Sequence, residues 1–260
     1  TTQGYAILLV EHRLDVVTPY ADKIAWLKDG KVNVYSDKKQ VLKNAAFMFG
    51  RKLKGAKNTS DPCFVLNDVS YTVGGRNILK NLSFTINKGE RVVVLGENGC
   101  GKTTLMRLLA RIINPTTGYI DQYIEKGKKR KPSAEWFKKV GFVYQNPNYQ
   151  LFMPRVLDEI SYQSKGELMT EYVIKRFNLV EIKERHPQSL SEGQKRRLTI
   201  ACVMAMEPEV ILLDEPTVGQ DHESLKNIID SLNEIHEKTG NTMITITHDF
   251  RCAESFADKI

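Results

Sequence analysis

The sequence lacks the features that mark zinc proteins, disulfide-stabilised proteins and membrane-spanning proteins. Only four of its 260 residues are cysteine and none of them forms a C-x-x-C pair, so we expect free thiols in a reducing cytoplasm. No apolar run approaches the roughly 18–20 residues that a helix needs to cross a bilayer. The first residues carry no secretory signal, and Thr1 stands in place of an initiator methionine, so we interpret the chain as a fragment.

The charge balance is basic but not selective. The 38 lysine and arginine residues outnumber the 31 aspartate and glutamate residues, which gives a formal net charge of +7. This charge permits an acidic partner, such as a nucleotide, a nucleic acid or an anionic membrane, without choosing among them. The length suffices for one large domain, or for one domain and a piece of another.

An internal repeat predicts how the chain is organised. Residues 4–12 align without gaps to residues 240–248, and residues 21–24 align in the same register to residues 257–260. We therefore expect the chain to start near the end of one module and to stop at the same point of the next. The predicted parts are a C-terminal remnant of a preceding module at 1–50, a linker at 51–62, and a second module, truncated at its C-terminal end, at 63–260.

The first copy has the pattern of the tail of an α/β module. A Lys-Asp-Gly turn separates two strand-like runs, at 24–27 and 31–35, and predicts a hairpin. We also expect a strand at 6–10 and helices at 13–21 and 38–46. The stretch that follows has few large apolar residues, which is why we interpret it as a linker.

A glycine-rich loop lies between a predicted strand and a predicted helix. Residues 96–104, GENGCGKTT, fit the pattern G-x-x-x-x-G-K-[ST] and follow a β-branched run at 91–95. Apolar residues then recur at helical spacing up to Ile112, and Asn114-Pro115 is expected to end that helix. The alternative to a functional loop is an ordinary glycine-rich turn entering a helix.

This phosphate loop, residues 96–104, is suited to hold the phosphates of ATP. Glycines let backbone N–H groups approach the phosphates, and the helix N-terminus adds unpaired donors. Lys102 would reach the β- and γ-phosphates, and the Thr103 hydroxyl would ligate Mg²⁺. The predicted ATP contacts of the loop are Gly96, Asn98, Gly99, Cys100, Gly101, Lys102, Thr103 and Thr104.

Cys100 has a second expected property because it lies inside this loop, near a helix N-terminus. Thiols in such places react readily, so we predict that alkylation of Cys100 blocks ATP binding and that ATP protects the thiol. The alternative is an inert small residue.

Two carboxylates follow a second buried strand. The apolar run at 210–213 leads directly into Asp214 and Glu215, and ligands bind at this end of the strands in an open α/β sheet. Asp214 would hold Mg²⁺. Glu215, pointing the other way if strand alternation persists, would be the general base for the attacking water. The alternative is a solvated carboxylate pair at a turn.

The order of these motifs resembles that of the ATP-binding-cassette ATPases. Residues 190–194, LSEGQ, look like the family's signature segment, with Glu192 where glycine is commonest. Ser191 and Gln194 also form an S-x-x-Q capping box, so a capped helix is expected, with Leu198 on its apolar face. In the family this helix start binds the γ-phosphate held by an opposing module, which implies ATP contacts for Ser191, Gly193 and Gln194.

The resemblance assigns roles to further residues one by one. Tyr71 is similar to the aromatic residue that stacks on adenine. Gln145 resembles the glutamine that contacts Mg²⁺ and the reacting water, and His248 resembles the histidine that senses the γ-phosphate. Asp221, in the segment 219–221, matches the loop that couples opposing sites. The histidines left over, which we interpret as surface or structural residues, are His186, His222 and His236.

The resemblance also implies a fold. The family has a P-loop NTPase (RecA-like) α/β core with an antiparallel β-subdomain, here near 64–86, and an inserted helical subdomain, here near 146–205.

A narrower resemblance points to a transporter subclass. Residues 145–152, QNPNYQLF, and 215–221 are similar to segments of tandem ATPases of energy-coupling-factor transporters, which import vitamins and transition-metal ions. This implies ATP and Mg²⁺ as cofactors. The implied partners are a second ATP-binding-cassette module, a transmembrane scaffold subunit and a substrate-binding membrane protein, without direct nucleic-acid contact. The implied location is cytoplasmic, on the inner face of the cell membrane.

Two alternatives stay open. A soluble cassette protein acting on ribosomes or DNA could use the basic stretches 51–57 and 126–131, although these also fit solvated loops. The sequence shows neither coiled-coil heptads nor a long helical linker between the copies, which favours the transporter. A binding module that has lost catalysis is the other alternative, and the presence of Lys102, Glu215 and His248 argues against it.

Overall fold

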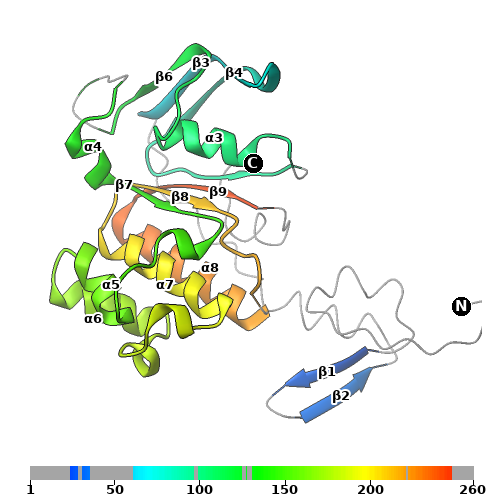
Figure 1. Ribbon diagram of the computed structural model, residues 1–260, viewed down its shortest axis with the longest axis vertical. Coiled ribbons are helices and arrows are strands. Elements are labelled where there is room, and N and C mark those ends of the chain that lie inside the picture. The colour runs from blue at the N-terminus through cyan, green and yellow to red at the C-terminus, as the bar shows by residue number, and fades with distance from the viewer. Residues whose placement is uncertain are drawn as a thin grey trace, which may run out of the picture.

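A computed structural model describes residues 24–28, 31–35, 61–96, 99–124, 127, 131–220 and 222–247, without the side chains of 24–28, 31–35 and 222. An antiparallel sheet, a parallel sheet and a group of helices follow one another from top to bottom in Figure 1. Every segment of the predicted site that is described lies in or between these three layers.

The antiparallel sheet has the strand order β4-β3-β6. Strands β3 (Pro62–Val73) and β4 (Arg76–Asn87) form a long hairpin. Its two turn residues, Gly74 and Gly75, have φ angles of 54° and 74°, which suit the tight turns that join twisted strands. The sheet confirms the antiparallel subdomain expected near 64–86 and adds β6 (Thr117–Gln122), which the sequence did not indicate.

The parallel sheet has the order β5-β9-β8-β7. Its strands are β5 (Arg91–Val94), β7 (Val140–Val143), β8 (Val210–Asp214) and β9 (Thr242–Ile246). Strands β8 and β9 are buried along their whole length, as continuous apolar runs in parallel sheets usually are. Ile246 pairs with both Val94 and Asp214, so the phosphate loop and the carboxylates leave the sheet at the same edge.

Helix α3 (Lys102–Leu109) lies between the two sheets, where it contacts β4 and β8 (Figure 1). It ends three residues before Ile112, so the helix expected from apolar spacing is too long. The cause is a Schellman motif: Arg111 takes a φ of 58° and donates its N–H to the carbonyl of Leu108 at 3.1 Å, and Ile112 donates to that of Arg107 at 2.9 Å. The Ile112 side chain is left 48% exposed.

The helices on the other side of the parallel sheet confirm the expected inserted helical subdomain. Helices α5 and α6 pack against α7, and α7 also contacts β7. The segments within 146–205 are η1 (Pro147–Tyr149), α5 (Val156–Gln163), α6 (Glu167–Arg176), η2 (Val180–Ile182), η3 (Pro187–Ser189) and α7 (Glu192–Ala205). Helix α8 (His222–Thr239) shares their core, whereas α4 (Ala134–Lys139) contacts β7 and buries Trp136 in the core on the side of α3.

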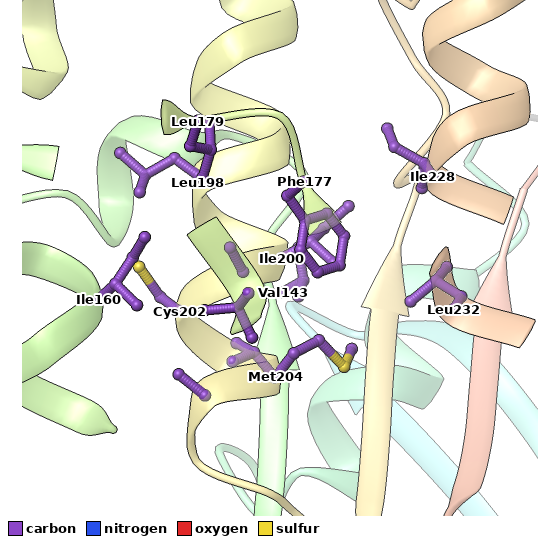
Figure 2. Packing of buried hydrophobic residues seen from close by; sticks show 14 of the residues in the cluster. Val143, Ile160, Phe177, Leu179, Leu198, Ile200, Cys202, Met204, Ile228 and Leu232 are labelled. Carbon is purple, nitrogen blue, oxygen red and sulfur yellow. The ribbon is translucent and has the colours of Figure 1, made fainter. Parts of the chain in front are cut away.

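Helix α7 occupies the centre of this layer (Figure 2). The side chains of Leu198 and Cys202 lie on the side of Ile160, whereas Ile200 lies near Phe177. Every residue from 198 to 205 is buried. The sequence predicted a single apolar face, but the second half of α7 is buried on all sides, as in a core helix.

The hairpin expected in the first copy is present as β1 (Ile24–Lys28) and β2 (Lys31–Tyr35), which pair antiparallel. The expected strand at 6–10, the helices at 13–21 and 38–46 and most of the linker lie outside the described residues. In the part of the chain that the structure describes, no helix combines the length and the apolar character needed to cross a membrane.

Candidate functional site

The phosphate loop connects β5 to α3 and is shaped by its glycines. Gly99 and Gly101 have φ angles of 82° and 102°, which side chains rarely permit. A Cβ atom on Gly101 would lie 2.8 Å from Cδ2 of Leu79 and 3.2 Å from the carbonyl oxygen of Ile78. Gly101 therefore lets the loop lie directly against β4. The predicted contact Asn98 lies outside the described residues.

The start of α3 offers positive charge and a helix N-terminus without a side-chain cap. The Nζ of Lys102 donates to the carbonyl oxygen of Gly96 at 2.7 Å, so the buried ammonium closes the loop upon itself. No side chain caps the helix, and its first turn has no acidic residue. The N-terminus of a helix attracts anions, so the arrangement fits a phosphate group.

Thr103 and Asp214 meet at the mouth of the loop. The Thr103 hydroxyl donates to Oδ1 of Asp214 at 3.3 Å. Two neighbouring ligands of an octahedral Mg²⁺, each about 2.1 Å from the ion, are about 3 Å apart, so these oxygens are spaced to share one Mg²⁺. Among the described residues no three His, Cys, Asp or Glu side chains cluster as a metal site. This is compatible with Mg²⁺, which keeps most of its ligands as water and phosphate oxygens.

Burial raises the pKa of Asp214, and neighbouring groups oppose that shift in part. The hydrogen bond from Thr103 and the charges of Arg107 and Arg196 lower the pKa, whereas the charge of Glu215 raises it. A buried carboxylate in this position gains from a nearby cation, which removes the cost of burying its charge.

The condition on which the sequence placed Glu215, a strand that continues through it, is not met. Strand β8 ends at Asp214, and Glu215 takes a φ of 51°, so strand alternation does not set its direction. Its N–H donates to the carbonyl oxygen of Ile246 at 3.0 Å, and its side chain is only 5% exposed. A left-handed conformation in a non-glycine residue costs energy and is frequent in active sites.

Gln145 follows β7 at the same edge of the sheet and is exposed. The glutamine loop, residues 144–150, is closed at its base by Gln150. The Oε1 of Gln150 accepts from the N–H of Tyr144 at 2.9 Å, and its Nε2 donates to the carbonyl oxygen of Phe142 at 2.7 Å. The structure thus fixes both ends of the loop and leaves Gln145 accessible.

The signature segment, residues 190–194, starts α7 with the predicted capping box. The N–H of Gln194 donates to the Ser191 hydroxyl at 3.3 Å, and the N–H of Ser191 donates to Oε1 of Gln194 at 3.0 Å. A Cβ atom on Gly193 would lie 3.3 Å from Oε1 of Gln220. Gly193 therefore allows the segment 219–220 to pack on the signature segment. Asp221 lies outside the described residues.

Tyr71 and His248 are the residues predicted to stack on the adenine and to sense the γ-phosphate. Tyr71 is half-buried on β3 and pairs with Leu79, the residue that contacts Gly101, so it lies one strand away from the phosphate loop. His248 and its counterpart His12 lie outside the described residues. Thr247, just before His248, donates its N–H to the carbonyl oxygen of Val94 at 3.4 Å, at the sheet edge where the phosphate loop begins.

The histidines without a predicted role are structural where their side chains are described. His186 accepts from the N–H of Gln188 at 3.1 Å, and His236 is buried with Nδ1 2.8 Å from the carbonyl oxygen of Asn241. The side chain of His222 is not among those described. The basic stretch 51–57 and all but two residues of 126–131 also lie outside the described residues.

Sequence reasoning missed the residues that brace the site. Arg196, Lys195 and Gln150 hold the glutamine loop, and Gln220 packs on the signature segment. The run of three basic residues at 195–197, directly before the apolar half of α7, is the one signal that could have identified Lys195 and Arg196.

Comparisons with known proteins agree with this geometry. The family described as ABC transporter matches residues 79–218. The chain is 29% identical over 301 residues to a putative HMP/thiamine import ATP-binding protein, YkoD, of Bacillus subtilis, covering 99% of this chain and 54% of that protein. It is 37% identical over 197 residues to the energy-coupling factor transporter ATP-binding protein EcfA2 of Bacillus licheniformis, covering 71% of this chain and 68% of that protein.

A solved structure shares the fold. The structure of cbiO1 from Clostridium perfringens, described as part of the ABC transporter complex cbiONQ, matches with a TM-score of 0.65 and 30% identity, covering 76% of this chain and 83% of that one. The chain thus spans about half of the first relative's length and most of the length of this structure.

Proposed function

The chain belongs to the ABC transporter family of ATPases, and from this premise we propose that the protein hydrolyses ATP to drive transport across a membrane. The observation that carries the proposal is the meeting of Thr103 with Asp214 beside the phosphate loop, at 3.3 Å. A hydroxyl and a carboxylate at the mouth of an anion-binding loop are the groups that phosphoryl transfer requires for its metal ion.

Each residue of the site has a proposed role. Thr103, Asp214 and Gln145 would hold Mg²⁺, which neutralises charge on the phosphates. Glu215 would orient the attacking water and accept its proton. Tyr71 would stack on the adenine, and His248 would contact the γ-phosphate. The remaining proposed nucleotide contacts are Gly96, Asn98, Gly99, Cys100, Gly101, Lys102, Thr104, Ser191, Gly193, Gln194 and Asp221.

We propose that two modules form the complete sites. The phosphate loop of one module and the signature segment of the other would enclose each ATP, and the repeat of 4–12 in 240–248 supports a second module in the same protein. The relation to YkoD, which covers 99% of this chain within a longer protein, also supports a tandem arrangement. Residues 1–50 would then belong to the first module, 51–62 to the linker and 63–260 to the second module.

The energy-coupling-factor subclass is the best-supported transporter type. The relation to EcfA2 and to cbiO1 supports it, together with the glutamine-loop sequence. Tyr149 and Phe152 are 67% and 77% exposed beside Gln145, which suits docking of a transmembrane scaffold subunit. The protein would lie on the cytoplasmic face of the cell membrane and power the import of a vitamin or a transition-metal ion.

Uptake by cells tests this proposal. Cells that produce the full-length protein with Glu215→Gln should lose ATP-dependent uptake of the radiolabelled vitamin or metal ion that wild-type cells accumulate. Glu209→Gln is the matched control, because Glu209 directly precedes the other end of β8 and its side chain forms a surface pair with Lys139. Normal uptake of every vitamin and metal tested in Glu215→Gln cells, with ribosomes co-purifying instead of membrane subunits, would contradict the proposal.

A further inference from the structure

Two adjacent basic residues of α7 are buried against the glutamine loop. Lys195 is 7% exposed and Arg196 is 5% exposed, although lysine and arginine usually extend into water. They follow directly after the signature segment, within the second turn of the helix. Burial of two cations costs free energy unless they are hydrogen-bonded or paired with an opposite charge. The contacts of Lys195 and Arg196 therefore indicate their role.

Arg196 binds the backbone immediately before Gln145. Its Nη1 donates to the carbonyl oxygen of Tyr144 at 2.9 Å. Burial lowers the pKa of Arg196, while the carboxylates of Glu192, Asp214 and Glu215 raise it and so favour the charged form. The guanidinium therefore joins α7 to the strand end from which Gln145 emerges.

Lys195 binds the far side of the same loop. Its Nζ donates to Oδ1 of Asn148 at 3.0 Å and to Oε1 of Gln188 at 3.3 Å, and it lies 3.6 Å from Oε1 of Glu192. Asn148 donates both its N–H and its side-chain amide to Oδ1 of Asn146, at 3.0 and 3.1 Å. Lys195 is thus linked through Asn148 to the residue that follows Gln145.

These contacts hold the loop on both sides of Gln145. Arg196 donates a hydrogen bond to Tyr144, and Lys195 donates one to Asn148, which in turn donates to Asn146. Both anchors stand on one helix, within two residues of the end of the signature segment. A helix transmits displacement of its first turn to its second because its backbone hydrogen bonds are rigid.

We propose that Lys195 and Arg196 are positioning residues that make the glutamine loop move with the first turn of α7. Binding of a phosphate at Ser191 and Gly193 would then determine the position of Gln145 in this module's own site. Helix α7 would thereby connect the two sites. Its signature segment would contact the ATP held by the opposing module, whereas Gln145 would act on the ATP held by this module. The inference rests on the proposed function of the site.

Steady-state hydrolysis of Mg-ATP by the full-length protein tests the proposal. Arg196→Gln should lower kcat about tenfold, because a charge-assisted hydrogen bond is lost, while KM for ATP changes less than about twofold because the phosphate loop is intact. Arg196→Lys keeps the charge and should recover part of kcat. In a Gln145→Ala background Arg196→Gln should cause little further loss, because Arg196 acts through Gln145.

Arg111→Gln is the matched control. Arg111 is also a partly buried arginine that donates to a backbone carbonyl, that of Ile120 at 2.6 Å, but it contacts no part of the glutamine loop. Its kcat should stay near that of the wild type. A tenfold loss in Arg111→Gln as well would overturn the proposal, because removal of any buried guanidinium would then have the same effect.

Further outcomes separate this inference from the proposed function. An unchanged kcat in Arg196→Gln, or independent losses that multiply in the double variant with Gln145→Ala, overturn the inference while wild-type hydrolysis stands. If Arg196→Gln does not fold, a cycle of Lys195→Met with Gln145→Ala decides. Losses that do not add indicate that Lys195 acts through Gln145, and additive losses refute it. Absence of hydrolysis in the folded wild type would instead refute the proposed function.

Discussion

The hydroxyl of Thr103 donates to the carboxylate of Asp214 at 3.3 Å, across 111 positions of the sequence. Thr103 belongs to the first turn of α3 and Asp214 ends β8. The pairing of β5, β9 and β8 in one parallel sheet brings them together, since their carboxyl ends share one edge. A phosphate-binding loop and a metal-binding carboxylate thus face the same space.

Asp214→Asn should stabilise the ligand-free protein and remove its response to Mg-ATP. Burial raises the pKa of Asp214 in the folded state, so the protonated side chain is the form that favours folding. Its contribution to stability is complete below the usual pKa of about 4 and is lost as the pH rises through the folded-state pKa. At pH 7 the variant should therefore melt a few degrees higher than the wild type, and this gain should shrink toward pH 4. Differential scanning calorimetry with and without Mg-ATP measures both effects, and Asp230→Asn, an exposed carboxylate, should change neither.

Gly101→Ala should abolish nucleotide binding and cost more stability than an alanine at another left-handed glycine. The new Cβ would press on Leu79 and on the carbonyl of Ile78, in addition to the strain of a positive φ. Gly74→Ala is the control, because Gly74 has a φ of 54° and nothing within 4 Å of its Cβ position. We expect about 1 kcal/mol of destabilisation for Gly74→Ala and clearly more for Gly101→Ala in urea denaturation. Equal losses would show that the contact with β4 is unimportant.

Alkylation should separate Cys100 from the buried cysteines. Cys100 is exposed, whereas burial raises the pKa of Cys63 to about 12 and that of Cys202 well above its usual value. With Cys252 replaced by serine, iodoacetamide at pH 8 should therefore label Cys100 alone. Peptide mass spectrometry with and without Mg-ATP measures the labelling, and Cys100→Ser should keep binding in the presence of the reagent. Labelling that ATP does not slow would argue against Cys100 as a nucleotide contact.

Glu234 should stabilise the contact between α6 and α8 at neutral pH only. It accepts hydrogen bonds from Lys238 at 2.7 Å and from Tyr172 at 2.9 Å, and its pKa is lowered, chiefly by the bond from Lys238. A carboxylate whose pKa is lower in the folded than in the unfolded protein stabilises the fold at pH values above its usual pKa of about 4.3. This stabilisation is lost as the pH falls through the folded-state pKa.

Denaturation in urea at pH 7 and below pH 4 tests this contribution. Because the Glu234 side chain is 37% exposed, Glu234→Gln should cost no more than about 1 kcal/mol at pH 7, and the difference should close in acid. The more exposed pair of Glu171 with Lys175, 3.7 Å apart, supplies the control, and Glu171→Gln should be neutral at both pH values. A difference that persists in acid would mean that the charge of Glu234 is not what stabilises the contact.

Local patterns predicted the parts of the site that short segments determine. The phosphate loop follows from its glycines and Lys102, and the capping box of Ser191 and Gln194 is a contact between residues three apart. The buried strand before Asp214 follows from its apolar run. In each case the residues that set the structure are neighbours in the chain, so the sequence alone carries the information.

Backbone conformations and distant contacts that no residue type marks decided what the patterns did not predict. Arg111 ends α3 in a left-handed conformation without glycine, so no residue type marked the stop. Glu215 leaves the strand through a positive φ, which cancels the alternation argument. The partner of Arg196 is a backbone carbonyl 52 positions away, and no periodicity reports a contact of that kind.

A calorimetric titration of the full-length protein with Mg-ATP tests the central claim most directly, with Lys102→Ala as the contrast. Lys102 is the one side chain that closes the phosphate loop among the contacts described here, through Gly96. The wild type should bind Mg-ATP, and Lys102→Ala should bind it about tenfold or more weakly, since a hydrogen bond to a charged group contributes about 1.5–3 kcal/mol. Equal affinity in the two proteins, or no binding by the folded wild type, would contradict the assignment of this loop as the nucleotide site.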